Sequence, residues 1–316
     1  MHLPIQATGK TFDVVALGEG MVEFNQTKAG QPAYLQGFGG DTSNAVIAAA
    51  RCGARCAYLS RVGRDASGQS LLALWSGEGV DTAGIELDAD HPTGIYFVTH
   101  GASGHAFSYL RAGSAASRMT PSWLQGEAVK NILLAGKILH VSGISLAISS
   151  SACDTVFAAM QLAHETSTLV SFDANLRLKL WPLARARACI TEAVAMSDLF
   201  LPSLDDAVSL CGLDEPDRII DWGHALGAKA VVLKLGSGGT LVSDGTRRER
   251  IAGHPVKLID ATGAGDCFSG NLLARMAQGA SLFDAARYAN AAAALAIQGF
   301  GAVAPLPRPD ALRALL

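Results

Sequence analysis

The sequence predicts an α/β protein with a central, mostly parallel sheet, helices on both faces of that sheet, and a small additional β-sheet. Three observations predict this architecture. Short apolar runs that end in glycine alternate with helical segments along most of the chain, as in a parallel sheet with crossover helices. Two β-prone regions interrupt this alternation. The composition, 49% hydrophobic and 17% charged over 316 residues, allows a large buried core.

The first third of the chain opens with strands and helices in alternation. Residues 12–19 (FDVVALGE) form a short apolar run closed by glycine, which predicts a buried first strand. A helix is expected over 43–54, a strand over 56–63 and a second helix over 67–80. This order is typical of consecutive strands in one parallel sheet.

Two regions break the alternation and predict the small sheet. Residues 93–111 contain two β-prone runs around the turn-forming GASG, which indicates a hairpin. Residues 22–38 also read as short extended pieces. We expect these regions to pair as a separate sheet, with lid elements at about 22–40 and 93–117.

The alternation returns after residue 135 and continues to a helix-rich end. The expected strands are 137–144, 167–174, 197–203 and 228–236, a hairpin is expected over 240–245 and 247–253, and the last helices over 267–279 and 281–301. No internal repeat, low-complexity linker or interior boundary is visible. We therefore expect a single domain over residues 1–316.

Charge and hydropathy exclude several classes of protein. The 25 basic and 28 acidic residues give a net charge of −3, so no basic footprint for nucleic acid is present. No apolar run approaches the ~20 residues of a membrane span. The start has no charged region followed by an apolar one, so we expect no signal peptide and a cytoplasmic enzyme.

The six cysteines include no CxxC pair. Cys52 and Cys56 lie four residues apart in a helical stretch and could supply half a metal site. No matching His/Cys pair lies elsewhere, so buried free thiols are the favoured interpretation.

The stretch DATGAGDCFSG (260–270) carries the strongest chemical signal. We expect an apolar strand ending near Ile259, then the glycine-rich turn, then Asp266 directly before a helix. The first N–H groups of a helix have no intrahelical partners and, with the macrodipole, bind anions. The glycines allow close approach of a charged group, and the helix dipole is expected to keep Asp266 ionised, ready to accept a hydroxyl proton.

From the residues alone, an ordinary turn with a capping aspartate explains the same stretch, because Asp and Gly are common in both settings. The string is neither a G-x-x-x-x-G-K-[ST] phosphate loop nor a G-x-G-x-x-G dinucleotide fingerprint. Both interpretations, a cap and an anion site with a base, remain open at this point.

Two signatures resemble the ribokinase/PfkB carbohydrate kinases. DATGAGDCFSG resembles that family's C-terminal DTTGAGDxF, with Ala261 where the family often has Thr. GGDTSNAVIAAARCGA (39–54), followed by SRVGRDASGQ (60–69), resembles the family's N-terminal signature. The two stand in the family's order, about 200 residues apart. The resemblance implies a ribokinase-like α/β fold over almost the whole chain.

The resemblance implies a mechanism of phosphoryl transfer from ATP to a sugar hydroxyl. Asp266 would be the catalytic base, and the N–H groups of Gly263, Ala264, Gly265 and Asp266 would form the anion hole. Mg²⁺ would bridge the ATP phosphates. The resemblance leaves a monovalent cation open as a further cofactor. The small sheet would close over the sugar as a lid and form the contact of a homodimer.

The nucleotide side follows more loosely from LKLGSGGTLV (233–242), which resembles the family's K-x-G-xx-G segment. A plain turn between two strands explains it as well. Lys234 is either a phosphate contact or the end of a buried strand, and Asn290 is either adenine-flanking or an exposed helical residue. The nucleotide-binding candidates are Asn175, Ser203, Lys234, Gly236, Ser237, Gly238, Gly239, Gly263, Gly265 and Asn290.

One departure from the family concerns the metal. Many members carry N-x-x-E where this chain has Ser203-x-x-Asp206. The carboxylate of Asp206 could hold a metal-bound water or could cap the following helix.

Four further strings resemble the subgroup of kinases that act on 2-keto-3-deoxygluconate: SYLRAGSAAS (108–117), ILHVSGISLAIS (138–149), SFDANLRLKLW (171–181) and GFGAVAPLP (299–307). This substrate is an acid sugar, and its carboxylate favours the paired donors of a guanidinium. Arg111 and Arg177 are the candidates, with ordinary ion pairs as the alternative for each.

The remaining sugar contacts come from both halves of the expected site. Tyr96 and Tyr109 would reach the sugar from the lid, or would simply pack in it. Gly40, Asp41 and Asn44 match the family's substrate-facing GGD-xx-N, and Asn44 offers both a donor and an acceptor. The implied reaction is phosphorylation of the C6 hydroxyl, giving a product for a catabolic aldolase.

The same residues bear on several rival functions. A kinase of fructose or ribose would have no use for Arg111 beside the lid, and the galacto epimer of the acid sugar cannot be separated from the gluco form. A non-catalytic sugar-binding relative need not keep the GAGD turn. A nicotinamide dehydrogenase is disfavoured because no glycine fingerprint follows the first strand.

Overall fold

The computed structural model describes residues 5, 9–101, 104–313 and 315. Its main element is a ten-stranded sheet with the order β14-β13-β12-β11-β10-β9-β1-β4-β5, in which β6 also pairs with β4. The strands are β1 (Phe12–Leu17), β4 (Cys56–Gly63), β5 (Val80–Asp81), β6 (Ile85–Asp88), β9 (Gly136–Ser142), β10 (Leu169–Asp173), β11 (Leu199–Phe200), β12 (Ala230–Lys234), β13 (Thr240–Ser243) and β14 (Arg248–Ile251).

Eight of the strands in this sheet run parallel, and the hairpin β13–β14 adds antiparallel strands at one edge. This confirms the mostly parallel sheet expected from the alternation of strands and helices. The predicted strand over 56–63 coincides with β4. The strand expected over 197–203 is shorter in the structure, where β11 has two residues.

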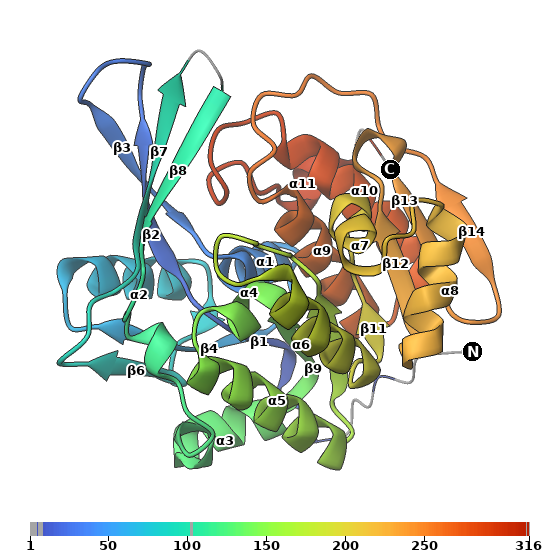
Figure 1. The fold of residues 1–316 in the computed structure, drawn as a ribbon, viewed down its shortest axis with the longest axis horizontal. Helices are drawn as coiled ribbons and strands as arrows, with labels where there is room; N and C mark the ends of the chain where they lie inside the picture. Colours follow the sequence, from blue (N-terminus) through green and yellow to red (C-terminus); the bar gives the residue numbers. More distant parts are fainter. Residues whose placement is uncertain (1–4, 6–8, 102–103, 314, 316) are drawn as a thin grey trace.

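Helices cover both faces of the main sheet (Figure 1). They are α1 (Asp41–Arg51), α2 (Ala66–Gly77), α3 (Glu127–Leu134), α4 (Gly143–Ala147), α5 (Ser150–Glu165), α6 (Leu183–Ala195), α7 (Leu204–Cys211), α8 (Pro216–Leu226), α9 (Ala264–Ala277), α10 (Leu282–Ala296) and α11 (Pro309–Leu312), with short 3₁₀ turns at Ala116–Arg118, Trp123–Gln125 and Gly236–Gly238.

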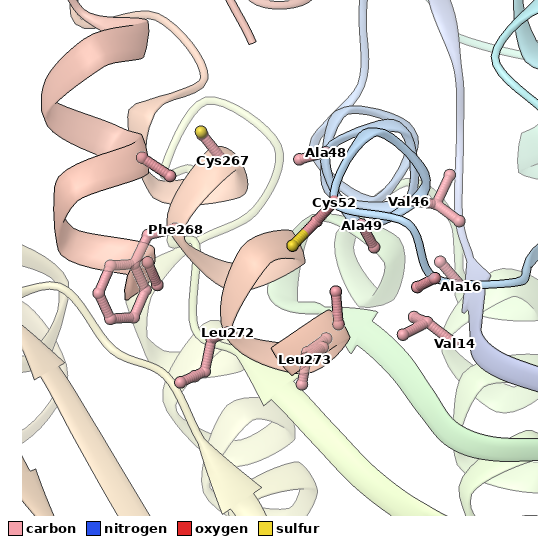
Figure 2. Packing of buried hydrophobic residues seen from close by; sticks show 14 of the residues in the cluster. Val14, Ala16, Val46, Ala48, Ala49, Cys52, Cys267, Phe268, Leu272 and Leu273 are labelled. Atoms are coloured by element: carbon pink, nitrogen blue, oxygen red, sulfur yellow. The ribbon is translucent and has the colours of Figure 1, made fainter. Parts of the chain in front are cut away.

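Strand β1 shows how one sequence serves two cores. Its side chains alternate between faces, as the period of a β-strand requires. Val14 and Ala16 belong to a cluster shared with α1, α2, α9 and α10, which Figure 2 shows in part. Val15 and Leu17 belong to a second cluster shared with α3 to α8. The continuous apolar run of β1 therefore fits a strand that is buried on both faces.

A second, four-stranded sheet has the order β3-β2-β7-β8 and stands away from the main sheet (Figure 1). Its strands are β2 (Met21–Gln26), β3 (Tyr34–Gly39), β7 (Ile95–Gly101) and β8 (Gly104–Leu110). We call it the small sheet. It unites the two regions that interrupted the alternation, so that prediction is confirmed.

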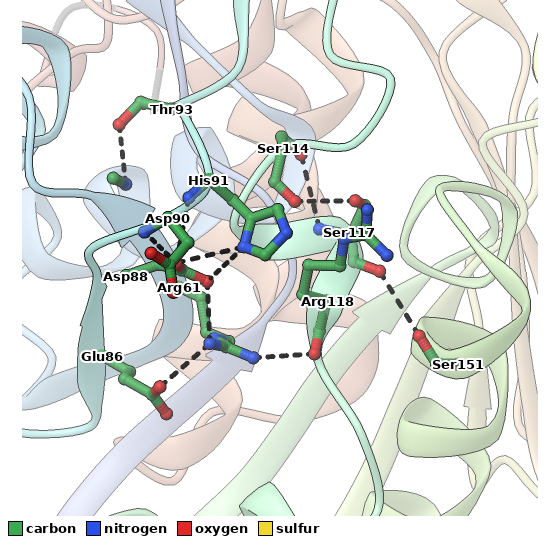
Figure 3. A network of polar contacts seen from close by, with 11 residues as sticks. Arg61, Glu86, Asp88, Asp90, His91, Thr93, Ser114, Ser117, Arg118 and Ser151 are labelled. Atoms are coloured by element: carbon green, nitrogen blue, oxygen red, sulfur yellow. Dashed lines mark hydrogen bonds and ion pairs between the residues drawn. The ribbon is translucent and has the colours of Figure 1, made fainter.

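A polar network fastens the base of the small sheet to the main domain (Figure 3). Arg61 of β4 donates to the carbonyl of Arg118 at 2.8 Å and pairs with Asp88 of β6 at 2.8 Å. Asp88 also accepts the backbone N–H of His91 at 3.0 Å. Thr93, just before β7, accepts the N–H of Gly63 at 2.9 Å. The chain therefore enters the small sheet from a braced position.

Two expectations about local structure need correction. The predicted apolar strand ending near Ile259 is absent: residues 252–263 contain no strand, and Leu258 and Ile259 are largely exposed. Ile259 and Asp260 instead donate their backbone N–H groups to the carbonyl of Ile297, just after α10, at 2.8 and 3.2 Å, so the segment follows the end of that helix and joins no sheet. In addition, α9 begins at Ala264, so Asp266 lies inside its first turn and not before it.

Two further expectations concern the cysteines and membrane spans. Cys52 caps the end of α1 and Cys56 begins β4, so the two do not share a helical stretch. All six cysteines are free, and Cys52 and Cys56 are buried thiols. Within the ranges that the structure describes, no helix combines the length and apolarity needed to cross a membrane.

Candidate active site

An open cleft of about 860 Å³ lies between the small sheet and the carboxyl ends of the main sheet's parallel strands. Strand β1 leads to Glu19, β10 ends at Asp173 and β12 ends at Lys234, and all three line the cleft. The small sheet contributes Tyr96 and Tyr109. Open α/β sheets commonly bind ligands at this edge, where successive strands deliver their terminal side chains to one place.

The amino end of α9 enters this cleft. Gly263 is its N-cap with φ 74°, a left-handed conformation that favours glycine. Ala264 donates its N–H to the carbonyl of Ala261 at 3.2 Å. Within the described residues, the N–H groups of Gly265 and Asp266 donate no hydrogen bond, so they are free for an anion in the cleft.

Asp266 sits at the centre of the cleft. Its Oδ2 accepts a hydrogen bond from Nδ2 of Asn44 at 2.8 Å. Burial, and then the nearby carboxylate of Asp41, raise the pKa of Asp266 to about 7. Burial and Asp41 thus oppose the helix dipole, which we expected to keep Asp266 ionised, and they move its titration towards neutral pH. A carboxyl with this pKa can exchange a proton at neutral pH, which suits a general base.

The first turn of α1 carries Asp41 and Asn44, and both side chains interact with Asp266. Gly40 is the N-cap of α1 with φ 106°, and a Cβ there would lie 2.2 Å from the carbonyl oxygen of Glu19. Asp41 Oδ2 accepts from Nδ2 of Asn175 at 3.0 Å, while Asp41 Oδ1 and Asn44 Oδ1 are buried without a partner among the described residues. Such orphaned acceptors beside a cleft fit a ligand rich in hydroxyl groups.

Asn175 holds Asp41 from a strained backbone. Its φ is +30°, which is uncommon for a residue other than glycine. Strain of this kind persists where the surroundings impose it, and it gathers at functional sites.

A second carboxylate organises the α9 end of the cleft. Asp173 is buried, and its Oδ2 accepts from Lys234 Nζ at 2.6 Å and from Ser269 Oγ at 3.0 Å. A Cβ on Gly265 would lie 3.5 Å from Lys234 Nζ. The ammonium of Lys234 therefore lies beside the first turn of α9.

On the small-sheet side, two tyrosines form the wall. Tyr96 is buried and donates its hydroxyl to Glu23 Oε2 at 2.5 Å. Burial raises the pKa of Glu23 even so. The ring of Tyr109 stacks on that of Tyr96 with centroids 5.6 Å apart, and Tyr109 is 39% exposed.

Four cationic side chains line the cleft: Arg111, Arg177, Lys179 and Lys234. Arg111 pairs with Glu19, which also accepts the hydroxyl of Ser114 at 2.5 Å. Lys234 pairs with Asp173. Arg177 donates to the carbonyl of Leu176 at 2.9 Å and, like Lys179, makes no ion pair within the described chain. Both stand in the loop after β10 and are exposed.

The entrance to α7 supplies a further acid. Ser203 is the N-cap of α7 and accepts the N–H of Asp206 at 3.2 Å, so the serine and not Asp206 caps this helix. Burial raises the pKa of Asp206. Its carboxylate lines the cleft together with that of Asp205.

The comparisons with known proteins agree with this geometry. Residues 10–309 match the pfkB family carbohydrate kinase. The chain belongs to the PfkB family of carbohydrate kinases.

Individual relatives of this PfkB kinase differ in substrate. A 2-dehydro-3-deoxygluconokinase from Thermoproteus tenax is 34% identical over 96% of this chain and 94% of its own. A probable fructokinase-7 from Arabidopsis thaliana is 31% identical over 96% and 92%. The solved structure of a putative ribokinase II from E. coli, in complex with ATP and Mg²⁺, superposes with a TM-score of 0.87 at 27% identity, covering 95% of this chain and 97% of that one.

Most of the predicted site residues of this PfkB kinase do meet in one cleft. The lining includes the following of them: Gly40, Asp41, Asn44, Tyr96, Tyr109, Arg111, Asn175, Arg177, Ser203, Asp206, Lys234, Gly236, Gly263, Ala264, Gly265 and Asp266. The structure also confirms the ribokinase-like fold, with its large, mostly parallel sheet and small second sheet.

Four predicted nucleotide contacts lie outside the lining: Ser237, Gly238, Gly239 and Asn290. The three residues after Gly236 make the turn between β12 and β13, which is the alternative given for this segment. Asn290 is buried and donates its side-chain amide to the carbonyl of Ala252 at 2.6 Å, so it is not an exposed helical residue.

Sequence reasoning missed Glu19, Asp173 and Ser269. The first two had a local signal, because each acid closes an apolar run at the carboxyl end of a predicted strand. Ser269 had none, since its bond to Asp173 spans 96 positions of the chain.

Proposed function

We propose that this PfkB kinase transfers the γ-phosphoryl group of ATP to the C6 hydroxyl of 2-keto-3-deoxy-D-gluconate, giving 2-keto-3-deoxy-6-phosphogluconate and ADP. The observation that carries the proposal is an exposed guanidinium, that of Arg177, at a cleft rich in buried carboxylates. A free guanidinium suits the carboxylate of an acid sugar, which offers paired acceptors. The 2-dehydro-3-deoxygluconokinase among the relatives supports the same substrate class.

In the proposed reaction, Asp266 is the base. Asn44 holds one of its oxygens at 2.8 Å, which leaves the other for the sugar hydroxyl. As Asp266 takes the proton, the hydroxyl oxygen attacks the γ-phosphorus, the bond to the bridging oxygen breaks, and ADP leaves. The free N–H groups of Gly265 and Asp266 would receive the charge that gathers on the phosphoryl oxygens.

Asp41, Tyr96 and Tyr109 would position the sugar. Asp41 Oδ1 is a buried acceptor without a partner and would bind a sugar hydroxyl. The stacked rings of Tyr96 and Tyr109 would cover the sugar from the small sheet, which would act as the lid and exclude water.

The cleft also fits the Mg²⁺ that accompanies ATP in kinases. The carboxylates of Asp205 and Asp206 are hard oxygen donors, which this ion prefers. Burial, and then the nearby Asp173, raise the pKa of Asp206 even though Arg177 and Lys234 lower it, and a bound cation would favour the charged carboxylate further. Asp205 and Asp206 would hold the Mg²⁺, which would supply positive charge that offsets the charge of the ATP phosphates.

One observation favours a second candidate, a fructokinase. Glu19 neutralises Arg111, so this arginine, which we expected to bind the acid group, is already paired. A neutral ketose would then fit the inner part of the cleft, and a fructokinase is among the relatives.

The test is ATP-dependent ADP release with Mg²⁺ across 2-keto-3-deoxygluconate, its galacto epimer, fructose, ribose and gluconate. Turnover confined to the keto-deoxy acids supports the proposal. A preference for fructose contradicts it and supports the second candidate. The panel is run with and without K⁺, because dependence on a monovalent cation belongs to the same hypothesis.

Arg177→Gln separates the two candidates within the protein. The change removes a charge that makes no ion pair in the described chain, so the fold should be little affected. We expect KM for the acid sugar to rise roughly ten- to a hundredfold, the scale of a lost charged hydrogen bond, with no effect on any residual fructose activity. Lys179→Gln, in the same loop, is the matched control for loss of a nearby charge.

Asp266→Asn tests the base. The amide keeps the size of the side chain but cannot accept the proton, so kcat should fall by about 10²- to 10⁴-fold. Thermal unfolding should be little changed. Near-normal turnover in this variant would show that another group is the base.

Three further parts of the proposal concern the whole protein. We propose one kinase domain over residues 1–316, a homodimer formed through the small sheet, and a cytoplasmic location. Six free thiols support a reducing compartment. The exposed Tyr34, Leu35 and Leu110 of the small sheet support a partner on that sheet.

A further inference from the structure

We propose that Asp173 is a positioning residue that aims the ammonium of Lys234 at the first turn of α9, where the transferring phosphoryl group would sit. This inference rests on the proposed kinase function, because the phosphate end of the cleft is defined by it. Asp173 also lines the cleft, but both of its oxygens accept hydrogen bonds from the protein, so it would act through Lys234.

The contacts of Asp173 join three elements at one carboxylate. Asp173 ends β10, and its Oδ2 accepts from Lys234 at the end of β12 and from Ser269 inside α9. Its Oδ1 accepts the N–H of Asn175 at 3.3 Å. Both oxygens thus accept hydrogen bonds from the protein, and the residue is 4% exposed. A side chain so constrained fixes whatever it holds.

Lys234 keeps hydrogen-bond donors for a ligand after it has paired with Asp173. An ammonium has three donors, and Asp173 takes one. The side chain of Lys234 is 13% exposed and lines the cleft, and its Nζ lies beside Gly265, whose N–H is free. The remaining donors therefore lie close to the first turn of α9, which carries the free N–H groups of Gly265 and Asp266. Without a partner, the flexible side chain of Lys234 would sample many positions. The ion pair with Asp173 offsets part of the positive charge but fixes the position of the ammonium.

Ser269 adds a reason to assign this role to Asp173. It lies one helical turn beyond Asp266 in α9. Its bond to Asp173 therefore ties the position of Lys234 to the helix that carries the base. Phosphoryl transfer depends on such alignment between the attacking and stabilising groups.

The test is a double-mutant cycle of Asp173→Asn and Lys234→Met. It is measured in kcat for the sugar and in the dissociation constant of MgATP by calorimetry. We expect Lys234→Met to lower kcat by about 10²-fold and Asp173→Asn by about tenfold or more, with KM for the sugar unchanged. If Asp173 acts through Lys234, the double variant is no slower than Lys234→Met alone.

Asp13→Asn is the matched control. Asp13 pairs with Lys137 at 2.7 Å in a similarly enclosed ion pair near the amino end of β1, an interior strand of the same sheet whose carboxyl end faces the cleft. The Asp13→Asn variant should lose thermal stability, as Asp173→Asn does, but its kcat should stay unchanged. Loss of kcat in Asp173→Asn beyond that of the control therefore reports on the site and not on the fold.

Two outcomes would overturn the inference. Asp173→Asn could behave like Asp13→Asn, with lower stability and normal kcat, which would make Asp173 a purely structural ion-pair partner. Alternatively, the effects of the two changes could multiply in both kcat and MgATP affinity. If no sugar is phosphorylated by the unchanged enzyme, the proposed function fails, and coupling in MgATP affinity alone then decides the inference.

Discussion

At the scale of single residues, the cleft is a set of carboxylates with different surroundings. Asp173 accepts hydrogen bonds from Lys234 and Ser269, whereas Asp266 lies near Asp41 and, among the residues that the structure describes, accepts a side-chain hydrogen bond from Asn44 alone. Environments that differ in this way assign different roles to chemically identical groups. Asp173 is suited to hold a cation, and Asp266 is suited to exchange a proton.

The pH dependence of the reaction should report on Asp266. Its pKa is raised to about 7, so the proton-accepting form is lost as the pH falls through that value. We expect kcat/KM for the sugar, at saturating MgATP, to fall below pH 7 with the slope of one proton.

Asp41→Asn identifies the group responsible for this profile. Removing the neighbouring negative charge should lower the midpoint, because Asp41 helps to raise the pKa of Asp266. Asp13→Asn, near the amino end of β1 and away from the cleft, should leave the midpoint in place. A midpoint that does not move in Asp41→Asn would show that a different group titrates.

At the scale of elements, the amino end of α9 combines a glycine cap with an anion site. Gly263 turns the chain into the helix with φ 74°, and a Cβ there would lie 3.1 Å from atoms of Ala302. The other end of α9 is followed by Gly279, with φ 97° and open space around its absent side chain. The two glycines share the backbone requirement and differ in their surroundings.

Substitution of these two glycines by alanine should therefore separate stability from activity. Each change should cost about 1–2 kcal/mol of unfolding free energy, the penalty for a left-handed non-glycine residue. Only Gly263→Ala must also push on Ala302 and shift the first turn of α9, so only this variant should lose kcat. Urea unfolding and steady-state kinetics measure the two effects. Equal kcat values in both variants would show that the start of α9 tolerates displacement.

Elements were also the part of the structure that the sequence predicted best. Strand β4 and the β7–β8 hairpin follow from local patterns, since apolar periodicity and turn residues act over a few positions. The strand expected to end near Ile259 is a loop, because Leu258 and Ile259 are exposed and local hydrophobicity cannot reveal exposure. The bonds Asn44–Asp266 and Lys234–Asp173 span 222 and 61 positions, so only the assembled sheet brings these side chains together.

At the scale of the whole molecule, the small sheet has two edge strands, β3 and β8, and exposes large apolar side chains on both. Leu35 of β3 is 67% exposed and Leu110 of β8 is 63% exposed. Exposed edges and apolar residues on one small sheet are features that proteins normally cover or blunt. This is the physical basis for the proposed dimer.

The double variant Leu35→Asp and Leu110→Asp should be monomeric. Strand alternation puts the two leucines on opposite faces of the small sheet. Leu35 pairs with Asn25, which pairs with Val98 of β7, whereas Leu110 pairs with Ile95, three positions before Val98 in the same strand. The added charges would therefore disfavour a partner on either face, because buried unpaired carboxylates are costly. Light scattering coupled to size-exclusion chromatography measures the mass. Leu258→Asp, equally exposed but on the loop before α9, should stay dimeric, and an unchanged mass in the double variant would place the subunit contact elsewhere.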